Sequence, residues 1–172
     1  MQDKVEATRF LEKLDSGNGF TFQTFDDGDE EKKPLARVRH GSLEEHFPLL
    51  GQLNDQGAGI FVTVNETDLK GRKTDNIISV RAVFADLDGA PLEPVREFGL
   101  KPHIIIETSP NRWHAYWPTK ELPLDEFTNI QKIIASRFRS DPAITDRSRV
   151  MRLPGFYHCK GEPFLVRIEH LT

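Results

Sequence analysis

The chain has 172 residues, of which 37% are hydrophobic and 29% charged, and its formal net charge at pH 7 is −4. This length is enough for one domain with a continuous apolar core. No stretch approaches the roughly 18 apolar residues of a membrane span, and the first residues lack the pattern of a secretory signal, so we expect a cytoplasmic protein without a membrane partner. The acidic balance disfavours a simple sequence-specific DNA-binding protein, which is usually basic.

The single cysteine and the clusters of charge indicate which kinds of site the chain can contain. Cys159 has no second cysteine to pair with, so it forms no internal disulfide and does not indicate a Cys/His zinc site. Acidic residues gather between Asp26 and Glu31, whereas arginines cluster between residues 137 and 152. A local positive potential of this kind binds phosphate even on an acidic protein.

Hydrophobic periodicity and turn residues divide the first half of the chain into short elements. Ser42 is followed three residues later by Glu45, which is the pattern of a capping box, and Pro48 is expected to distort or divide the helix that starts there. In chain order we predict a helix over 3–15, a strand from Phe20, a solvated hairpin tip without function over 26–33, a return strand over 35–39, a helix over 43–54 and a central strand over 58–65.

The second half alternates strands with two helical stretches. The predicted elements are a polar loop over 66–76, a strand over 80–87, a short helical piece over 93–98, strands over 103–107 and 112–117, a helix over 123–138, a loop over 140–148, and strands over 149–153 and 164–168. No repeat or linker composition interrupts residues 1–172. We therefore predict a single α+β domain, in which helices flank a central mixed, mostly antiparallel sheet.

The most informative stretch runs from Val80 to Gly89, where β-favouring apolar residues end in two carboxylates separated by one leucine. Alternate side chains of a strand share a face, so Asp86 and Asp88 lie about 6–7 Å apart on one side. Two like charges this close repel each other, and a divalent cation with hard oxygen ligands, Mg²⁺ or Mn²⁺, relieves the repulsion. The alternative is a strand that ends in an ordinary Asp-rich turn.

The predicted strand over 112–117 has two different faces. Its two tryptophans share an apolar face, whereas Arg112 and His114 share the other, polar face. A histidine beside an arginine is suited to hold an anion, and Ser109 in the preceding turn adds a hydroxyl and backbone N–H donors. The alternative is a surface histidine on a half-exposed strand.

Acids and arginines mix between residues 140 and 155. Asp141 and Asp146 offer metal ligands, and Arg149 and Arg152 offer cations for a triphosphate, which together suit nucleotidyl transfer. Lys160 is a further candidate cation. Exposed ion pairs of little energetic value are the alternative explanation for this segment.

The order of these motifs resembles the primase–polymerase branch of the archaeo-eukaryotic primases, in particular the replication primases of plasmids and phages. The resemblance covers about residues 54–168 and rests on Asp86-Leu87-Asp88, on His114, and on Arg152-Leu153-Pro154-Gly155 followed by Lys160. Arg112 departs from the family pattern, which has a small residue there. Either Asp141 or Asp146 is the lone third acid, and we prefer Asp141 because plasmid members tend to have Asp-Pro-Ala at this place.

The resemblance implies a primase or DNA polymerase that performs two-metal nucleotidyl transfer in plasmid or phage replication, with an RRM-like element in its fold. The implied catalytic set is Asp86, Asp88, His114 and Asp141, and the three acids, with Asp146 as the alternative third one, would hold two Mg²⁺ or Mn²⁺ ions. The implied ligands of the nucleoside triphosphate are Ser109, Arg112, His114, Arg152 and Lys160. A single-stranded DNA template is expected to meet Arg72, Lys73 and Arg149.

The same resemblance bears on how far the natural chain extends. Family members commonly continue into a helical domain or work with a replicative helicase. Residues 1–172 are therefore expected to be one catalytic domain, with a C-terminal extension and such a partner as further expectations.

Two rival hypotheses come from other classes of protein. The stretch from Phe84 to Gly89 also resembles the first motif of haloacid-dehalogenase phosphatases, but that fold needs a parallel sheet with the motif near its N-terminus and a second acidic pair downstream. The other rival is a non-catalytic nucleic-acid-binding module on a degenerate primase fold. The joint presence of the carboxylates, His114 and the Arg-Leu-Pro-Gly turn argues against degeneracy.

Overall fold

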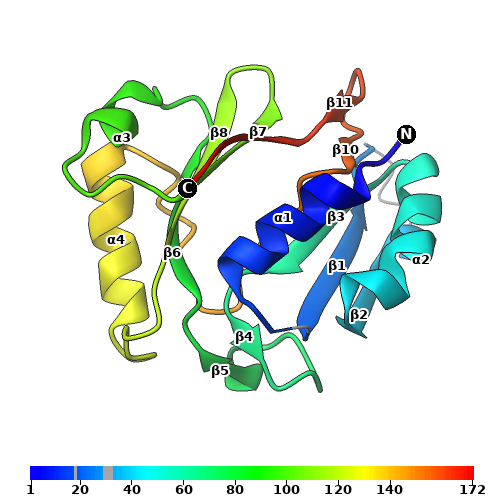
Figure 1. Cartoon of the computed structure of the whole chain (residues 1–172), viewed down its shortest axis with the longest axis horizontal. Coiled ribbons are helices and arrows are strands. Elements are labelled where there is room, and N and C mark those ends of the chain that lie inside the picture. Colours follow the sequence, from blue (N-terminus) through cyan, green and yellow to red (C-terminus); the bar gives the residue numbers. More distant parts are fainter. Residues whose placement is uncertain (18, 29–32) are drawn as a thin grey trace.

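The computed structural model describes residues 1–17, 19–28 and 33–172. Its strands form two four-stranded sheets (Figure 1). The first sheet has the order β2-β1-β3-β9, and consists of β1 (Phe20–Asp26), β2 (Arg37–Gly41), β3 (Ala58–Thr63) and β9 (Val150–Arg152). The second sheet has the order β12-β7-β8-β6, and consists of β6 (Ala82–Leu87), β7 (Ile104–Ser109), β8 (Arg112–Pro118) and β12 (Arg167–Leu171).

Smaller elements complete the architecture. Two short hairpins pair β4 (Glu66–Thr67) with β5 (Ile77–Ser79) and β10 (Tyr157–His158) with β11 (Phe164–Leu165). The helices are α1 (Lys4–Leu14), α2 (Leu43–Asp55), α3 (Glu93–Glu97) and α4 (Phe127–Phe138), with single 3₁₀ turns at Lys33–Leu35 and Thr74–Asn76. None of these helices, within the residues that the structure describes, is long and apolar enough to cross a membrane.

The predicted α+β class is confirmed, with the strands divided between two sheets instead of one central sheet. Each sheet has helices of its own, since α1 and α2 cover the first sheet while α3 and α4 lie beside the second (Figure 1). The larger apolar core joins α1, α2, the first sheet and one face of the second sheet. The smaller core lies on the opposite face of the second sheet, against α3 and α4. All strand pairs in the described part of the chain are antiparallel, which excludes the parallel sheet of the phosphatase hypothesis.

Three local predictions differ from the structure or lie outside it. Pro48 does not divide α2, because the loss of one backbone hydrogen bond is outweighed by the burial of Leu50 and Leu53 on the same helix. The predicted loop over 66–76 contains part of the β4–β5 hairpin. Of the predicted hairpin tip over 26–33, residues 29–32 lie outside the described residues.

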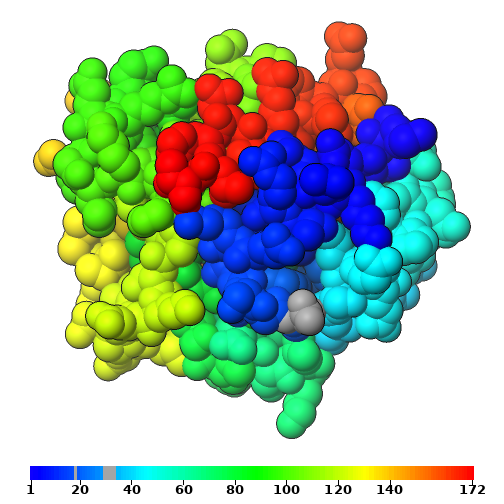
Figure 2. Space-filling model, viewed as in Figure 1, coloured from blue at the N-terminus to red at the C-terminus, as the bar shows by residue number. Residues whose placement is uncertain are grey.

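The first helix and the last strand lie side by side across one surface of the domain (Figure 2). The Ile168 N–H donates a hydrogen bond to the Glu6 carboxylate, and the Asp3 N–H donates one of 2.7 Å to the Gly155 carbonyl oxygen. Gly155 has a φ of 88°, and a Cβ added there would overlap the carbonyl oxygen of Asp3. The glycine of the Arg-Leu-Pro-Gly turn therefore allows the start of α1 to pack directly against the turn.

Candidate active site between the two sheets

The pairing of β6 with β8 brings the first predicted carboxylate next to the predicted histidine. Asp86 lies directly opposite His114 in the strand register, and Asp86 Oδ1 is 3.6 Å from His114 Nε2. Just beyond the end of β6, Asp88 forms an ion pair with Arg112. Two acid–base pairs thus cross from one strand to the other beside the β7–β8 turn.

His114 is buried, with 6% of its surface exposed, and its Nδ1 lies 3.2 Å from the Tyr116 hydroxyl. The face of β8 that was predicted to be polar is in fact inside the larger core, because the second sheet has a core on both of its faces. Burial lowers the pKa of His114, and the charge of Asp86 opposes this effect. The nearby charges of Arg152 and His158 lower the pKa further, so the imidazole is neutral at pH 7.

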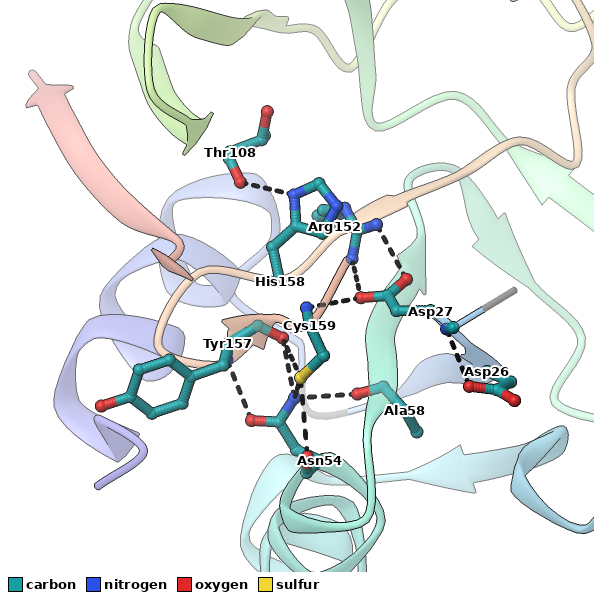
Figure 3. Close-up of polar contacts among 10 residues, drawn as sticks. Asp26, Asp27, Asn54, Ala58, Thr108, Arg152, Tyr157, His158 and Cys159 are labelled. Atoms are coloured by element: carbon teal, nitrogen blue, oxygen red, sulfur yellow. Dashed lines mark hydrogen bonds and ion pairs between the residues drawn. The ribbon is translucent and has the colours of Figure 1, made fainter. Parts of the chain in front are cut away.

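A second cluster of polar side chains gathers around the ion pair between Asp27 and Arg152 (Figure 3). Arg152 in β9 donates two hydrogen bonds of 2.9 Å to the Asp27 carboxylate, which also accepts one of 2.9 Å from the Cys159 N–H. A Cβ on Gly59 would lie 2.5 Å from Asp27 Oδ1 and 2.7 Å from Arg152 Nη1. The close ion pair therefore requires the glycine at this place in β3.

Asp27 corrects the prediction that the whole hairpin tip is solvated. Its side chain is 6% exposed, and it fixes the guanidinium of a predicted nucleotide ligand. No local pattern reveals this role, because the two paired residues are 125 positions apart in the sequence.

His158 in β10 is a further residue of this cluster that the sequence prediction missed. Its Nδ1 lies 3.0 Å from the Thr108 carbonyl oxygen, which can only accept, so Nδ1 carries the proton and Nε2 carries the lone pair. That Nε2 is buried and has no hydrogen-bond partner within the described residues. Burial lowers the pKa of His158, and the charge of Arg152 adds to the effect. A histidine two positions before Lys160 was the signal available in the sequence.

The two candidates for the third acid lie in different surroundings. The Asp141 N–H donates a 3.0 Å hydrogen bond to the Asp86 carbonyl oxygen, and Asp141 Oδ1 accepts one of 2.9 Å from the Ala143 N–H. Asp146 forms an ion pair of 2.5 Å with Arg149 instead. The backbone of Asp141 is therefore adjacent to that of Asp86, whereas the charge of Asp146 is already balanced by Arg149.

The other predicted ligands are spread around this centre. Ser109 ends β7 and pairs in register with Arg112, and Lys160 is exposed but near enough to lower the pKa of His158. Arg72 and Lys73 lie on the separate loop between β4 and β5, where the Arg72 guanidinium is 6.0 Å from the centre of the Phe25 ring.

The chemistry of Asp86 and Asp88 suits Mg²⁺ or Mn²⁺. Both side chains reach solvent, with exposed fractions of 21% and 56%, and the Arg112 guanidinium that pairs with Asp88 stands where positive charge is needed. No group of three His, Cys, Asp or Glu side chains within the described part of the chain forms a complete metal site. Mg²⁺ often keeps several waters and binds one or two carboxylates together with substrate phosphates, so this donor set fits it.

The two-sheet architecture is that of the catalytic domains of primases and primase–polymerases. The catalytic domain of primase RepB′, solved in complex with initiator DNA, superposes with a TM-score of 0.77 at 22% identity over 97% of this chain and 84% of that one. The AEP domain of the cyanophage S-2L primase–polymerase superposes with a TM-score of 0.75 at 20% identity, over 99% of this chain and 91% of that one.

Sequence comparison identifies the family to which the chain belongs. The family described as RepB DNA-primase N-terminal domain matches residues 50–172, and the chain belongs to it. Mobilization protein A of Escherichia coli is 26% identical over 119 residues, which are 69% of this chain but 16% of that relative. The resemblance to plasmid and phage primases is thereby confirmed.

Proposed function

We propose that this domain is a template-dependent nucleotidyltransferase, a primase or DNA polymerase, that joins nucleotides on single-stranded DNA in plasmid or phage replication. One observation carries the proposal: the Asp86–His114 pair on the second sheet lies close to Arg152 in β9 of the first sheet, near enough for the guanidinium charge to lower the pKa of His114. A nucleoside triphosphate brings about four negative charges, and it needs both metal-binding carboxylates and fixed cations around it. We call Asp86, Asp88 and Asp141 the acidic edge, and Arg152 with Lys160 the basic edge. Together the two edges meet this need.

The acidic edge holds the metal ions. Asp86, Asp88 and Asp141 are the proposed ligands of two Mg²⁺ or Mn²⁺ ions. Bound ions in such a site supply the positive charge that activates an attacking 3′-hydroxyl and neutralises the leaving pyrophosphate. Arg112 leaves Asp88 when that carboxylate takes part in metal binding, and it is then available to the triphosphate.

The basic edge orients the triphosphate. Arg152 is held in place by Asp27, so its guanidinium is preorganised for a phosphate oxygen. Lys160, Ser109 and His114 complete the proposed set of triphosphate ligands. The template is proposed to meet Arg72, Lys73 and Arg149. The initiator DNA bound to the RepB′ catalytic domain supports DNA as the partner, and a helicase or helical domain is proposed as a further one.

The direct test is incorporation of labelled nucleotides. The domain is incubated with single-stranded DNA, labelled nucleotides and Mn²⁺ or Mg²⁺, and the products are separated by length. We expect elongated product that disappears when a chelator is added. DNA binding without any incorporation would instead support the non-catalytic module.

The third acid can be identified by two matched substitutions. Asp141→Asn is expected to lower the rate of incorporation about 100-fold or more, because a metal ligand is lost next to Asp86. Asp146→Asn removes an ion pair with Arg149 and is expected to change the rate less than about fivefold. Both rates are measured at saturating template. The opposite ranking would assign the ligand to Asp146.

A further inference from the structure

A row of side chains crosses the first sheet and ends at the candidate active site. The strand registers place Val38, Gln23, Phe61 and Arg152 next to one another across β2, β1, β3 and β9. Neighbours of opposite phase on the same strands, such as Phe22 and Val62, belong to the core beneath α1 and α2. The row therefore lies on the face of the sheet that points away from these helices.

This face carries aromatic surface that the core does not use. Phe25 lies on the same face as Gln23, is 38% exposed and has its ring centroid 5.6 Å from that of Phe61, at an interplanar angle of 68°. Phe61 is itself only half-buried. Large neighbouring aromatic side chains that remain in solvent are typical of a binding surface.

A guanidinium group flanks each ring. The Arg152 guanidinium lies 4.7 Å from the centre of the Phe61 ring, and that of Arg72 lies 6.0 Å from the centre of the Phe25 ring. Arginine and phenylalanine thus form a continuous strip from the β4–β5 loop to Arg152. Proteins that bind single-stranded nucleic acid combine these two groups, since the bases stack on aromatic rings while cations meet the phosphates.

We propose that Phe25 and Phe61, flanked by Arg72 and Arg152, form a stacking platform for unpaired bases of a single-stranded DNA template. The proposal rests on the proposed function, because the strip ends at Arg152 and so leads a bound strand toward Asp86 and His114. Stacking on a ring requires no particular base, so this platform binds the template without sequence preference.

Phe25 is the residue to change, since it is exposed and takes no part in the proposed catalysis. Phe25→Ala is expected to weaken binding to a fluorescent oligothymidylate about five- to a hundred-fold, measured by anisotropy without metal or nucleotide. Phe25→Trp keeps a ring and is expected to bind like the wild-type protein. Ile133→Ala removes an exposed apolar side chain, 62% exposed, from α4 and is expected to leave the affinity unchanged.

A strand with abasic sites separates stacking from other effects. It keeps every phosphate but has no bases, so the difference between wild-type and Phe25→Ala protein is expected to vanish on it. Equal affinities of the two proteins for intact DNA, or an equal loss on intact and abasic strands, would overturn the platform. Melting curves of each variant establish that the fold is intact.

The platform and the proposed function fail in different ways. If the wild-type protein incorporates nucleotides at saturating template but Phe25→Ala binds single-stranded DNA as tightly as the wild type, the platform is overturned and the proposed function is supported. Ring-dependent binding of single-stranded DNA without any incorporation supports the platform and overturns the proposed polymerase activity.

Discussion

Replacing Asp86 by asparagine is expected to reduce nucleotide incorporation by about 10³-fold or more while leaving the fold intact. Asparagine keeps the size of the side chain but removes the charge that binds a divalent ion. The Asp86 carbonyl oxygen, which accepts the hydrogen bond from Asp141, is unaffected because it belongs to the backbone. Primer extension at several Mn²⁺ concentrations measures the loss, and a melting curve measures the fold.

A second readout and a control make this experiment specific. The charge of Asp86 raises the pKa of His114, so Asp86→Asn is expected to lower that pKa further, which an NMR titration of the imidazole detects. Asp125→Asn removes an exposed carboxylate just before α4 and is expected to leave incorporation unchanged. Full activity of Asp86→Asn would show that Asp86 binds no essential metal ion.

Gly155→Ala is expected to lower the free energy of unfolding by about 2–5 kcal/mol. The left-handed backbone at this residue, with a φ of 88°, is unfavourable for alanine by about 1–2 kcal/mol. The added methyl group also overlaps the carbonyl oxygen of Asp3, so the start of α1 has to move, which costs about 1–3 kcal/mol more. Urea unfolding of the two proteins measures the difference.

Gly161→Ala is the matched control. Gly161 also has a left-handed backbone, with a φ of 72°, but a Cβ there meets no atom within 4 Å. This variant is therefore expected to lose only the backbone contribution of about 1–2 kcal/mol. Equal losses in the two variants would mean that the overlap between the added methyl group and Asp3 costs no stability.

The sequence predicted those features that depend on local periodicity. The alternation in β6 placed Asp86 and Asp88 on one face, and the Pro-Asn turn indicated that the strand carrying His114 folds back on its neighbour. The register that sets Asp86 opposite His114 depends on how β6 finds β8, and no residue pattern within either strand specifies it.

Features that depend on distant packing were not predictable in this way. The polarity of His114 suggested an exposed face, yet the ring is buried because Tyr116 and Phe84 beside it belong to the larger core. Asp27 stood in an acidic stretch with no sign of a partner, and only the fold brings it to Arg152. His158 had a sequence signal, its position near the Arg-Leu-Pro-Gly turn, but not one strong enough to distinguish it from an ordinary surface histidine.

The ion pair between Asp27 and Arg152 determines how far the domain can be shortened from its N-terminus. The family match starts at residue 50, whereas Asp27, β1, β2 and α1 all precede it. A fragment trimmed to that boundary would keep β3 and β9 without the rest of their sheet, and Arg152 would lose the carboxylate that holds it. A shortened version of this domain therefore has to retain the residues before position 50, which the family match does not include.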